Sequence, residues 1–332
     1  MPAIAFLYPG AMGASLASVL HRTQPSYRLL TSIASRSRVT TERSDASGLN
    51  NLPLPDVVTQ ADIIISILPP AAALDLAHIV RALLDENPRT TPPVYVDANA
   101  VNPATMAEMA AALGDVPLLD GAIIGFPAKD EYLPKLYLSA APEWAADLEH
   151  VARTLSGGGP GKGLDVRVMQ DGGAGAASAL KMSYSGLAKG YIGLGAILAI
   201  AANAHSPGTA RAFMEEMAES QPDRLWNLGG TIHHMIPNAY RFSGEMDQVS
   251  EFISTALDLP PDGEPSPATV YTGLATVFER VAADLRSTGR AVGSASHGPE
   301  GDAEEVEALL TWVKDSRHLL EAKGYQGNGN GH

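Results

Sequence analysis

The sequence predicts two domains: an α/β domain built on a parallel sheet, followed by an all-α domain. In residues 1–170 short β-rich runs alternate with helical stretches, the pattern of a helix-covered parallel sheet. From residue 171 onward nearly every segment has the pattern of a helix. A chain of 332 residues with 45% hydrophobic content is long enough for two domains and can bury a large core.

Seven segments of the first domain have the composition of strands. They are residues 3–8, 28–33, 62–68, 94–97, 117–123, 135–140 and 165–169. Residues 11–22, 71–85, 103–113 and 142–155 are predicted helices between them. The last two begin with proline, whose missing N–H costs nothing in a first turn.

The second domain is predicted to be helical throughout. Its helices are expected at residues 174–204, 207–220, 222–235, 239–257, 267–287 and 302–323. We place the domain boundary at residue 170, which gives domains 1–170 and 171–326. The tail 327–332 is polar and rich in glycine, so we expect it to be disordered.

Composition narrows the range of functions. The chain has 23 Lys and Arg against 37 Asp and Glu, a net charge of −14, which argues against nucleic acid and anionic membranes as partners. The absence of cysteine excludes disulfides, thiolate nucleophiles and Cys-ligated zinc. His233 and His234 are adjacent and do not face one another on a helix, so we predict no metal site.

The start of the chain and its most apolar run bear on localisation. Met1 leads into the first strand without a basic leader, so we expect a cytoplasmic protein. The apolar run 190–204 is shorter than the ~20 residues of a membrane span. We therefore predict a buried core helix there, and no membrane association.

The first strand runs directly into a glycine-containing turn, Tyr8-Pro9-Gly10-Ala11-Met12-Gly13. A dinucleotide-binding turn of the Rossmann type carries three glycines, and Tyr8 occupies the place of the first. The turn nevertheless joins a strand to a helix, whose free N–H groups can receive a phosphate. We expect Gly10, Ala11, Met12 and Gly13 to bind the cofactor.

The end of the second strand predicts which dinucleotide binds. An NAD site carries an acidic residue there, whereas this chain has Ser35, Arg36 and Ser37. A guanidinium and two hydroxyls suit a 2′-phosphate, so we predict NADP rather than NAD. The alternative is a solvated basic loop.

Together these segments resemble the β-hydroxyacid dehydrogenase superfamily, which contains hydroxyisobutyrate and phosphogluconate dehydrogenases. More narrowly, the chain resembles a branch with an NADP-binding domain and a helical C-terminal domain of unknown function. The chain also resembles the imine reductases, which have the same architecture. The resemblance rests on the segments 8–13, 67–70, 97–103, 120–126 and 238–246, and on the helix that carries Lys181.

The resemblance implies further site residues. Leu68, Pro69 and Asn99 would border the cofactor, and Gly125 and Phe126 would lie in the loop that receives the substrate. In the superfamily that loop has a serine and paired glycines for a carboxylate. Here Ile124 replaces the serine and Phe126 the second glycine, and an isoleucine side chain cannot hydrogen-bond. We therefore expect a substrate less acidic, bulkier or more hydrophobic than a short hydroxy acid.

Lys181 stands among small, apolar residues and is a candidate proton donor or acceptor. Ser185 follows one turn later on the same helix face, where the family pattern has asparagine. Tyr184, Tyr240 and Arg241 are further candidates for contacts with substrate. The alternative for Lys181 is a surface lysine with a structural role.

The sequence thus predicts an NADP-dependent oxidoreductase acting on a small molecule. Hydride would move between the nicotinamide and a hydroxyl or carbonyl carbon, with Lys181 as general acid or base and Ser185 beside it. Reduction of C=N bonds and a non-catalytic NADP-binding role are the alternatives. A glycine- and alanine-rich helix of some thirty residues also leads us to expect a homodimer joined through the helical domains, with each cleft bordered by both subunits.

Overall fold

The computed structural model describes residues 1–33, 38–259, 266–287 and 304–325. The chain divides into two compact units, Met1–Met182 and Ser183–His332. A mostly parallel sheet covered by helices forms the first, and helices form the second, which confirms the predicted fold class. The predicted boundary after residue 170 stays a prediction. The predicted tail 327–332 lies outside the described residues.

The first unit is built on one sheet with the strand order β3-β2-β1-β4-β5-β6-β7-β8. Its strands are β1 (Ala3–Leu7), β2 (Arg28–Thr31), β3 (Asn50–Asn51), β4 (Ile63–Ser66), β5 (Val94–Asp97), β6 (Leu118–Ile124), β7 (Lys135–Ala140) and β8 (Asp165–Val168). The strands from β3 to β6 run parallel, so the carboxyl ends of β1, β4, β5 and β6 meet at one edge. All seven predicted strands are present.

One strand breaks the parallel pattern. β7 pairs with β6 antiparallel, with Ile124 opposite Lys135. The connection between them, residues 125–134, contains no helix, and a short connection can join only antiparallel neighbours. The sheet is therefore parallel except at this one pairing.

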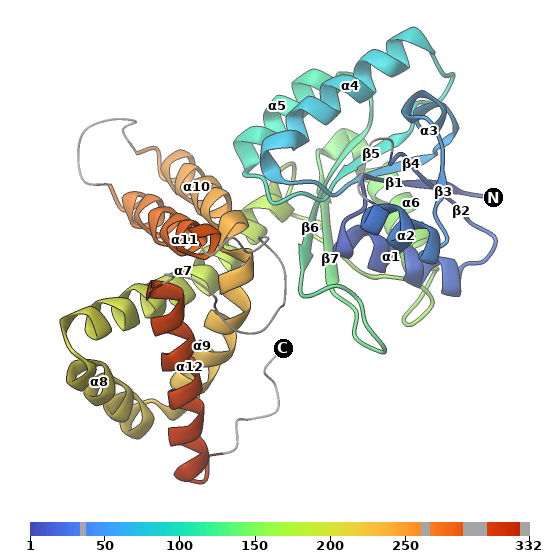
Figure 1. The fold of residues 1–332 in the computed structure, drawn as a ribbon. Helices are drawn as coiled ribbons and strands as arrows, with labels where there is room; N and C mark the ends of the chain where they lie inside the picture. The colour runs from blue at the N-terminus through green and yellow to red at the C-terminus, as the bar shows by residue number, and fades with distance from the viewer. Residues whose placement is uncertain (34–37, 260–265, 288–303, 326–332) are drawn as a thin grey trace. The chain divides into compact units, whose positions relative to one another are not determined.

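Helices cover both faces of the sheet (Figure 1). They are α1 (Ala11–Thr23), α2 (Arg38–Ala46), α3 (Leu54–Gln60), α4 (Ala73–Glu86), α5 (Pro103–Leu113) and α6 (Ala145–Ser156), with short 3-10 turns at Pro70–Ala72 and Pro142–Trp144. Along β1, Ile4 and Phe6 face α1 and α6, whereas Ala5 and Leu7 face α3, α4 and α5. Both faces of each central strand are therefore buried, which explains their continuous apolar runs.

The second unit consists of helices. α7 (Ala176–His205) begins in the first unit and continues into the second, followed by α8 (Pro207–Ser220), α9 (Pro222–Met235), a 3-10 turn (Ile236–Asn238), α10 (Ala239–Ala256), α11 (Thr269–Ser287) and α12 (Glu304–Ala322). α10 packs along α11, and α9 packs along α12 (Figure 1). The core side chains include Phe242, Phe278 and Trp312.

Glycines let α7 approach its neighbours closely. A Cβ at Gly186 would lie 2.9 Å from Val249, and one at Gly193 would lie 2.8 Å from Leu274. Both distances are shorter than side-chain carbons tolerate. By length and composition α7 is also apolar enough to cross a membrane, and 44% of its most apolar window is buried inside the protein.

Candidate cofactor and active site

Most of the predicted site residues of the first unit follow the carboxyl ends of adjacent parallel strands. Gly10 to Gly13 follow β1, Leu68 and Pro69 follow β4, and Asn99 follows β5. Gly125 and Phe126 follow β6. The sheet order β1-β4-β5-β6 therefore gathers these positions at one edge, where open α/β sheets bind their ligands.

The turn between β1 and α1 has the geometry of a phosphate-binding turn. Tyr8, in place of the first glycine, adopts a left-handed conformation with φ of 52°. Gly10 caps α1 with no side-chain hydrogen bond, and a Cβ added there would meet nothing within 4 Å. The first turn of α1 contains no acidic residue. Among the described residues no side chain caps this helix end, which carries the positive end of the helix dipole and so suits a phosphate.

Gly13 has a packing role in the same turn. A Cβ at Gly13 would lie 3.2 Å from Pro9 and 3.6 Å from Ile67 at the end of β4. The missing side chain lets α1 lie close to the sheet, the role of the third glycine in this fingerprint.

Asn99 is buried and bonded to protein groups on all sides. Its Nδ2 donates to Ser66 Oγ at 2.8 Å and also to Asp97 Oδ1, and its Oδ1 accepts from the backbone N–H of Leu68. Only 3% of Asn99 is exposed. The side chain thus fixes the backbone of Leu68 and Pro69, and a direct cofactor contact by Asn99 stays a prediction.

Two buried carboxyl groups lie opposite one another on neighbouring strands, Asp97 on β5 and Asp120 on β6. Burial raises the pKa of Asp97 to about 7, and the nearby Asp120 carboxylate contributes to the rise. Burial also raises the pKa of Asp120, but hydrogen bonds from Ser178 and Ser139 oppose that rise. The hydrogen bonds to Asp120 thus favour its charged form, whereas Asp97, with its pKa near 7, takes up a proton near neutral pH.

Asp120 holds the beginning of α7. Its carboxylate accepts hydrogen bonds from the backbone N–H of Ser178 at 2.8 Å and from Ser178 Oγ at 2.7 Å. Ser139 Oγ donates to it at 3.2 Å and accepts from the N–H of Ala177 at 3.0 Å. A negative charge at a helix N-terminus is favourable, so this contact fixes the first turn of α7 on β6.

Lys181 lies one turn further along α7 and is also tied to β6. Its Nζ donates to the backbone carbonyl of Ile123 at 2.6 Å, and the side chain is partly buried. Gly125 and Phe126 follow two and three residues after Ile123. The predicted proton-transfer group and the predicted substrate loop are therefore neighbours at the end of β6.

The loop after β6 has a constrained start. Gly125 adopts φ of 127°, and a Cβ there would collide with the hydroxyl of Tyr132. That hydroxyl accepts from the N–H of Phe126 at 3.2 Å, and 44% of Phe126 is exposed. The loop therefore presents an aromatic side chain to solvent.

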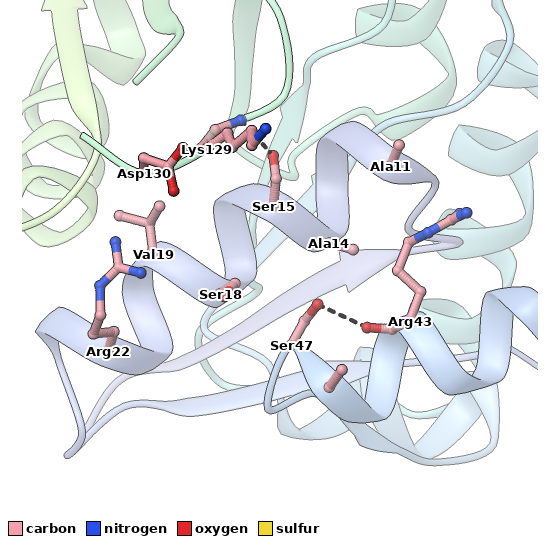
Figure 2. Close-up of a pocket in the computed structure, with 12 residues that line it drawn as sticks. Ala11, Ala14, Ser15, Ser18, Val19, Arg22, Arg43, Ser47, Lys129 and Asp130 are labelled. Atoms are coloured by element: carbon pink, nitrogen blue, oxygen red, sulfur yellow. Dashed lines mark hydrogen bonds between the residues drawn. The ribbon is translucent and has the colours of Figure 1, made fainter. Parts of the chain in front are cut away.

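A cavity of about 330 Å³ lies along the outer side of α1, between α2 and the loop after β6 (Figure 2). In Figure 2, Arg43 extends from α2 toward the first turn of α1 at Ala11, whereas Arg22 and Asp130 lie at the opposite end. Within the described part of the chain, Arg43 forms no ion pair. The cavity thus brings an uncompensated guanidinium to the helix end that suits a phosphate.

The predicted site residues of the second unit have mixed surroundings. Ser185 is 2% exposed, and its Oγ accepts from Lys189 Nζ at 2.7 Å. Lys189 also donates to Glu245 Oε2 at 2.6 Å, and Arg241 lies 4.0 Å from the same carboxylate. A catalytic role for Ser185 stays a prediction, and its burial in an ion-pair cluster favours a structural one. Tyr184 and Tyr240 are 55% and 46% exposed, respectively.

Other predicted positions cannot be placed. Ser35, Arg36 and Ser37, on which the NADP prediction rests, lie outside the described residues. Among the residues the structure describes, no group of three or more His, Asp or Glu is placed to hold a metal.

The sequence did not reveal the role of the buried polar residues that hold the site in place through hydrogen bonds. Asp97 and Asp120 were recognised only as parts of motifs, although an aspartate in an otherwise apolar strand is a signal in itself. Ser139 and Ser178 carried no such signal, because serine is common in strands and helices alike. Their role follows from the pairing of β6 with β7 and from where α7 begins.

Comparison with known proteins finds a family model that matches part of the second unit, and solved structures with the same fold. Residues 204–281 match the model of a domain of unknown function, DUF1932. Among curated proteins, none matches the chain. Among solved structures, 3-hydroxyisobutyrate dehydrogenase from Mycobacterium tuberculosis, with L-serine, superposes with a TM-score of 0.60 at 15% identity, covering 93% of this chain and 99% of that one. This chain has the fold of the 3-hydroxyacid dehydrogenases.

Two further structures agree with that fold. A conserved protein of unknown function, reported as structurally similar to 3-hydroxyacid dehydrogenases, gives a TM-score of 0.59 at 22% identity, covering 87% of this chain and all of that one. Prephenate dehydrogenase from A. aeolicus, in complex with hydroxyphenyl propionate and NAD⁺, gives 0.50 at 15% identity, covering 96% and 98%. The resemblance to the β-hydroxyacid dehydrogenases, in the branch with a helical C-terminal domain of unknown function, is thereby confirmed at the level of fold.

Proposed function

We propose that this protein is an NADP-dependent oxidoreductase that transfers hydride between the cofactor and a hydroxyl or carbonyl carbon of a small molecule. The proposal rests on two features at the carboxyl-terminal edge of the sheet: a helix end that suits a phosphate, and an ammonium group that can transfer a proton. The open N-terminus of α1 lies at the end of β1, and the ammonium group of Lys181 lies at the end of β6. These strands are three steps apart, or roughly 14 Å, a span suited to a dinucleotide lying across the edge.

The residues at this edge fit a dinucleotide. The N–H groups of Gly10 to Gly13 would hold the pyrophosphate, because no described side chain caps them and the first turn of α1 has no acidic residue. Leu68 and Pro69, held in place by Asn99, would form the wall beside it. Prephenate dehydrogenase, which shares this fold, is in complex with NAD⁺, and this supports a nicotinamide cofactor.

The preference for NADP rests on cations. Arg36, with Ser35 and Ser37, stands where a carboxylate would select NAD. Arg43 adds a guanidinium that lines the cavity beside Ala11. In a chain with a net charge of −14, Arg43 beside the phosphate-binding turn and the cationic motif of Arg36 in the sequence together support a cofactor with an additional phosphate.

The chemistry divides between cofactor and protein. A bound nicotinamide would supply or accept the hydride. Lys181 would give a proton to the substrate oxygen in reduction and remove it in oxidation. Its hydrogen bond to Ile123, together with the hold of Asp120 on the start of α7, keeps the ammonium next to the loop of Gly125 and Phe126. The residue is thus positioned before any substrate arrives.

The loop of Ile124 and Phe126 shapes the substrate class. Neither side chain can hydrogen-bond a carboxylate, and Phe126 offers an exposed aromatic surface. We therefore propose a substrate with an apolar group beside the reacting carbon. The same observation keeps reduction of C=N bonds as the second candidate, since an imine needs no carboxylate site.

The proposal is tested by a cofactor-monitored screen. Hydroxy acids, sugar acids, ketones and imines are each offered with NADPH or NADP⁺ and, separately, with NADH or NAD⁺. We expect turnover with an apolar ketone or alcohol and the phosphorylated cofactor. Turnover confined to imines would favour the second candidate, and tight NADPH binding without any turnover would indicate a non-catalytic protein.

Direct titration tests the cofactor preference separately. NADPH should bind markedly more tightly than NADH. Equal affinity for both would contradict the role given to the arginines while leaving a dinucleotide site intact.

A further inference from the structure

The cavity along the outer side of α1 has a second charged end, remote from the phosphate-binding turn (Figure 2). Ala11, with Arg43 reaching toward it, lies in the first turn of α1, and Arg22 lies in the last. α1 has 13 residues, which at 1.5 Å per residue gives a length of about 20 Å. A phosphate oxygen accepts hydrogen bonds over only about 3 Å, so one phosphate group cannot reach both ends. A phosphate held beside Ala11 would therefore leave the other end of the cavity vacant.

This other end is lined by side chains of α1 and of the loop after β6. They are Ser18, Arg22, Lys129 and Asp130, which we call the Arg22 end.

The cavity carries a local excess of positive charge. Among its described lining residues, Arg22, Arg43 and Lys129 are cationic, and Asp130 alone is acidic. Over the whole chain the balance is the reverse, with 37 acidic residues against 23 basic ones. In the described parts of the chain neither Arg22 nor Lys129 forms an ion pair. Two unpaired cations from separate elements thus face one cavity, which suits an anion.

The position of Arg22 has a simpler explanation, which accounts for only part of this arrangement. A cation in the last turn of a helix complements the helix dipole without any ligand. That role does not explain Lys129, which comes from a different element. Nor does it explain Ser18, which lies one turn before Arg22, is half-buried, and has a hydroxyl without a hydrogen-bond partner among the described residues. This hydroxyl is available to a ligand.

The loop that carries Lys129 is fixed against α1. The backbone N–H of Ala128 donates to Ser15 Oγ at 3.0 Å, and Ser15 Oγ donates to the carbonyl of Met12 at 2.8 Å. Lys129 and Tyr132 exchange two backbone hydrogen bonds, which close the loop into a tight turn. The backbone on both sides of the cavity is thus in place before a ligand arrives, which lowers the entropy cost of binding.

We propose that the Arg22 end of the cavity is a second binding site, separate from the cofactor site, for the phosphate group of a small molecule. Arg22 and Lys129 would donate to the phosphate oxygens, and Ser18 and Asp130 would hydrogen-bond hydroxyl groups beside it. The whole cavity, of about 330 Å³, is within the range of small-molecule sites. A phosphate ester and free phosphate share this chemistry, and the test separates them. The inference goes beyond the proposed oxidoreductase activity and does not depend on it.

Isothermal titration calorimetry on the full-length protein tests the proposal at constant ionic strength. The probes are glycerol 3-phosphate, inorganic phosphate and, as the uncharged control, glycerol. We expect the wild type to bind glycerol 3-phosphate and not glycerol. Arg22→Gln and Lys129→Gln should each weaken that binding at least about tenfold, the effect of one lost charge-assisted hydrogen bond. Lys162→Gln is the matched control: Lys162 is exposed outside the cavity, so its loss should change the affinity less than about twofold.

The outcomes separate the two sources of phosphate from a failure of the proposal. Tighter binding of glycerol 3-phosphate than of inorganic phosphate would assign the site to an ester, and equal binding would assign it to the free ion. No binding by the wild type would overturn the proposal. Binding that Arg22→Gln and Lys129→Gln leave unchanged, or that Lys162→Gln weakens equally, would also overturn it.

Chemical modification locates the site on the wild-type protein. Acetic anhydride acetylates exposed lysines, and mass spectrometry of the peptides gives the rate at each position. Saturating glycerol 3-phosphate should slow the acetylation of Lys129, whose ammonium the phosphate would cover, and leave that of Lys162 unchanged. An unchanged rate at Lys129 would overturn the proposal.

Discussion

At the scale of single residues, the site depends on buried polar groups that hold its backbone in place. Asn99 fixes the backbone of Leu68, and Asp97 in turn accepts from Asn99. Asp97 is fully buried and shares its surroundings with Asp120. Because two close carboxylates that are both buried cannot both ionise cheaply, Asp97 takes up a proton near neutral pH.

The raised pKa of Asp97 predicts that the free energy of unfolding depends on pH. An unfolded aspartate titrates near 4, and Asp97 in the folded protein near 7. Between these values the folded state binds a proton that the unfolded state has lost, so the free energy of unfolding falls as pH rises. About three pKa units correspond to a loss on the order of 4 kcal/mol.

Asp97→Asn should remove this contribution, because the amide is neutral at every pH. Urea unfolding of wild type and variant at pH 5 and pH 8 measures the difference. We expect the wild type to lose more stability between the two values than the variant does. Equal losses would show that Asp97 does not titrate in this range.

Arg43 offers a second prediction at this scale. Arg43→Ala should weaken NADPH binding by about 1.5–3 kcal/mol, the worth of a charge-assisted hydrogen bond, and weaken NADH binding less, because NADH lacks the additional phosphate. Arg22→Ala is the control, because Arg22 lines the other end of the same cavity. Isothermal titration calorimetry with both cofactors measures these affinities. Similar effects of the two substitutions would indicate that the overall charge of the cavity matters, rather than a direct contact by Arg43.

At the scale of elements, the pairing of β6 with α7 determines where Lys181 lies. Asp120 accepts two hydrogen bonds from Ser178 at the helix start, and Lys181 bonds to Ile123 three residues further along the strand. Strand and helix are thus tied at two points, one turn apart. The arrangement orients the lysine through backbone and carboxylate contacts rather than through a second charged side chain.

Asp120→Ala should therefore destabilise the first unit strongly. The N–H and hydroxyl of Ser178 would lose their buried partner, at a cost of roughly 3 kcal/mol. Glu108→Ala, at an exposed position within α5, should change stability by less than about 0.5 kcal/mol. Thermal unfolding compares the two, and matching midpoints would contradict the role given to Asp120.

The elements themselves were largely predictable, for a physical reason. β1, β4 and β5 are buried on both faces, so each appears in the sequence as a continuous apolar run. β3 has two exposed asparagines, and α2 buries a single residue, Ser44, so neither carries a hydrophobic pattern. The reversed direction of β7 leaves no mark in its own composition.

At the scale of the whole molecule, the carboxyl-terminal edge of the sheet brings together the glycine turn and the lysine helix, which are far apart in the sequence. The glycine turn and the lysine helix were both found from local pattern, because glycine and an isolated lysine stand out among apolar neighbours. The supporting carboxylates could not be assigned roles, since their partners are remote in sequence: 58 positions separate Asp120 from Ser178. Folding, rather than local chemistry, creates that contact.

The central claim is that Lys181 transfers the proton in a reaction dependent on NADP. The most direct measurement compares the turnover of wild type and Lys181→Ala on the best substrate of the screen, with the NADPH dissociation constant as control. We expect the rate constant to fall roughly 10²- to 10⁴-fold, as for a lost general acid or base, while NADPH affinity barely changes. Unchanged turnover, or loss of folding or of NADPH binding together with activity, would contradict the mechanism and leave Lys181 with a structural role.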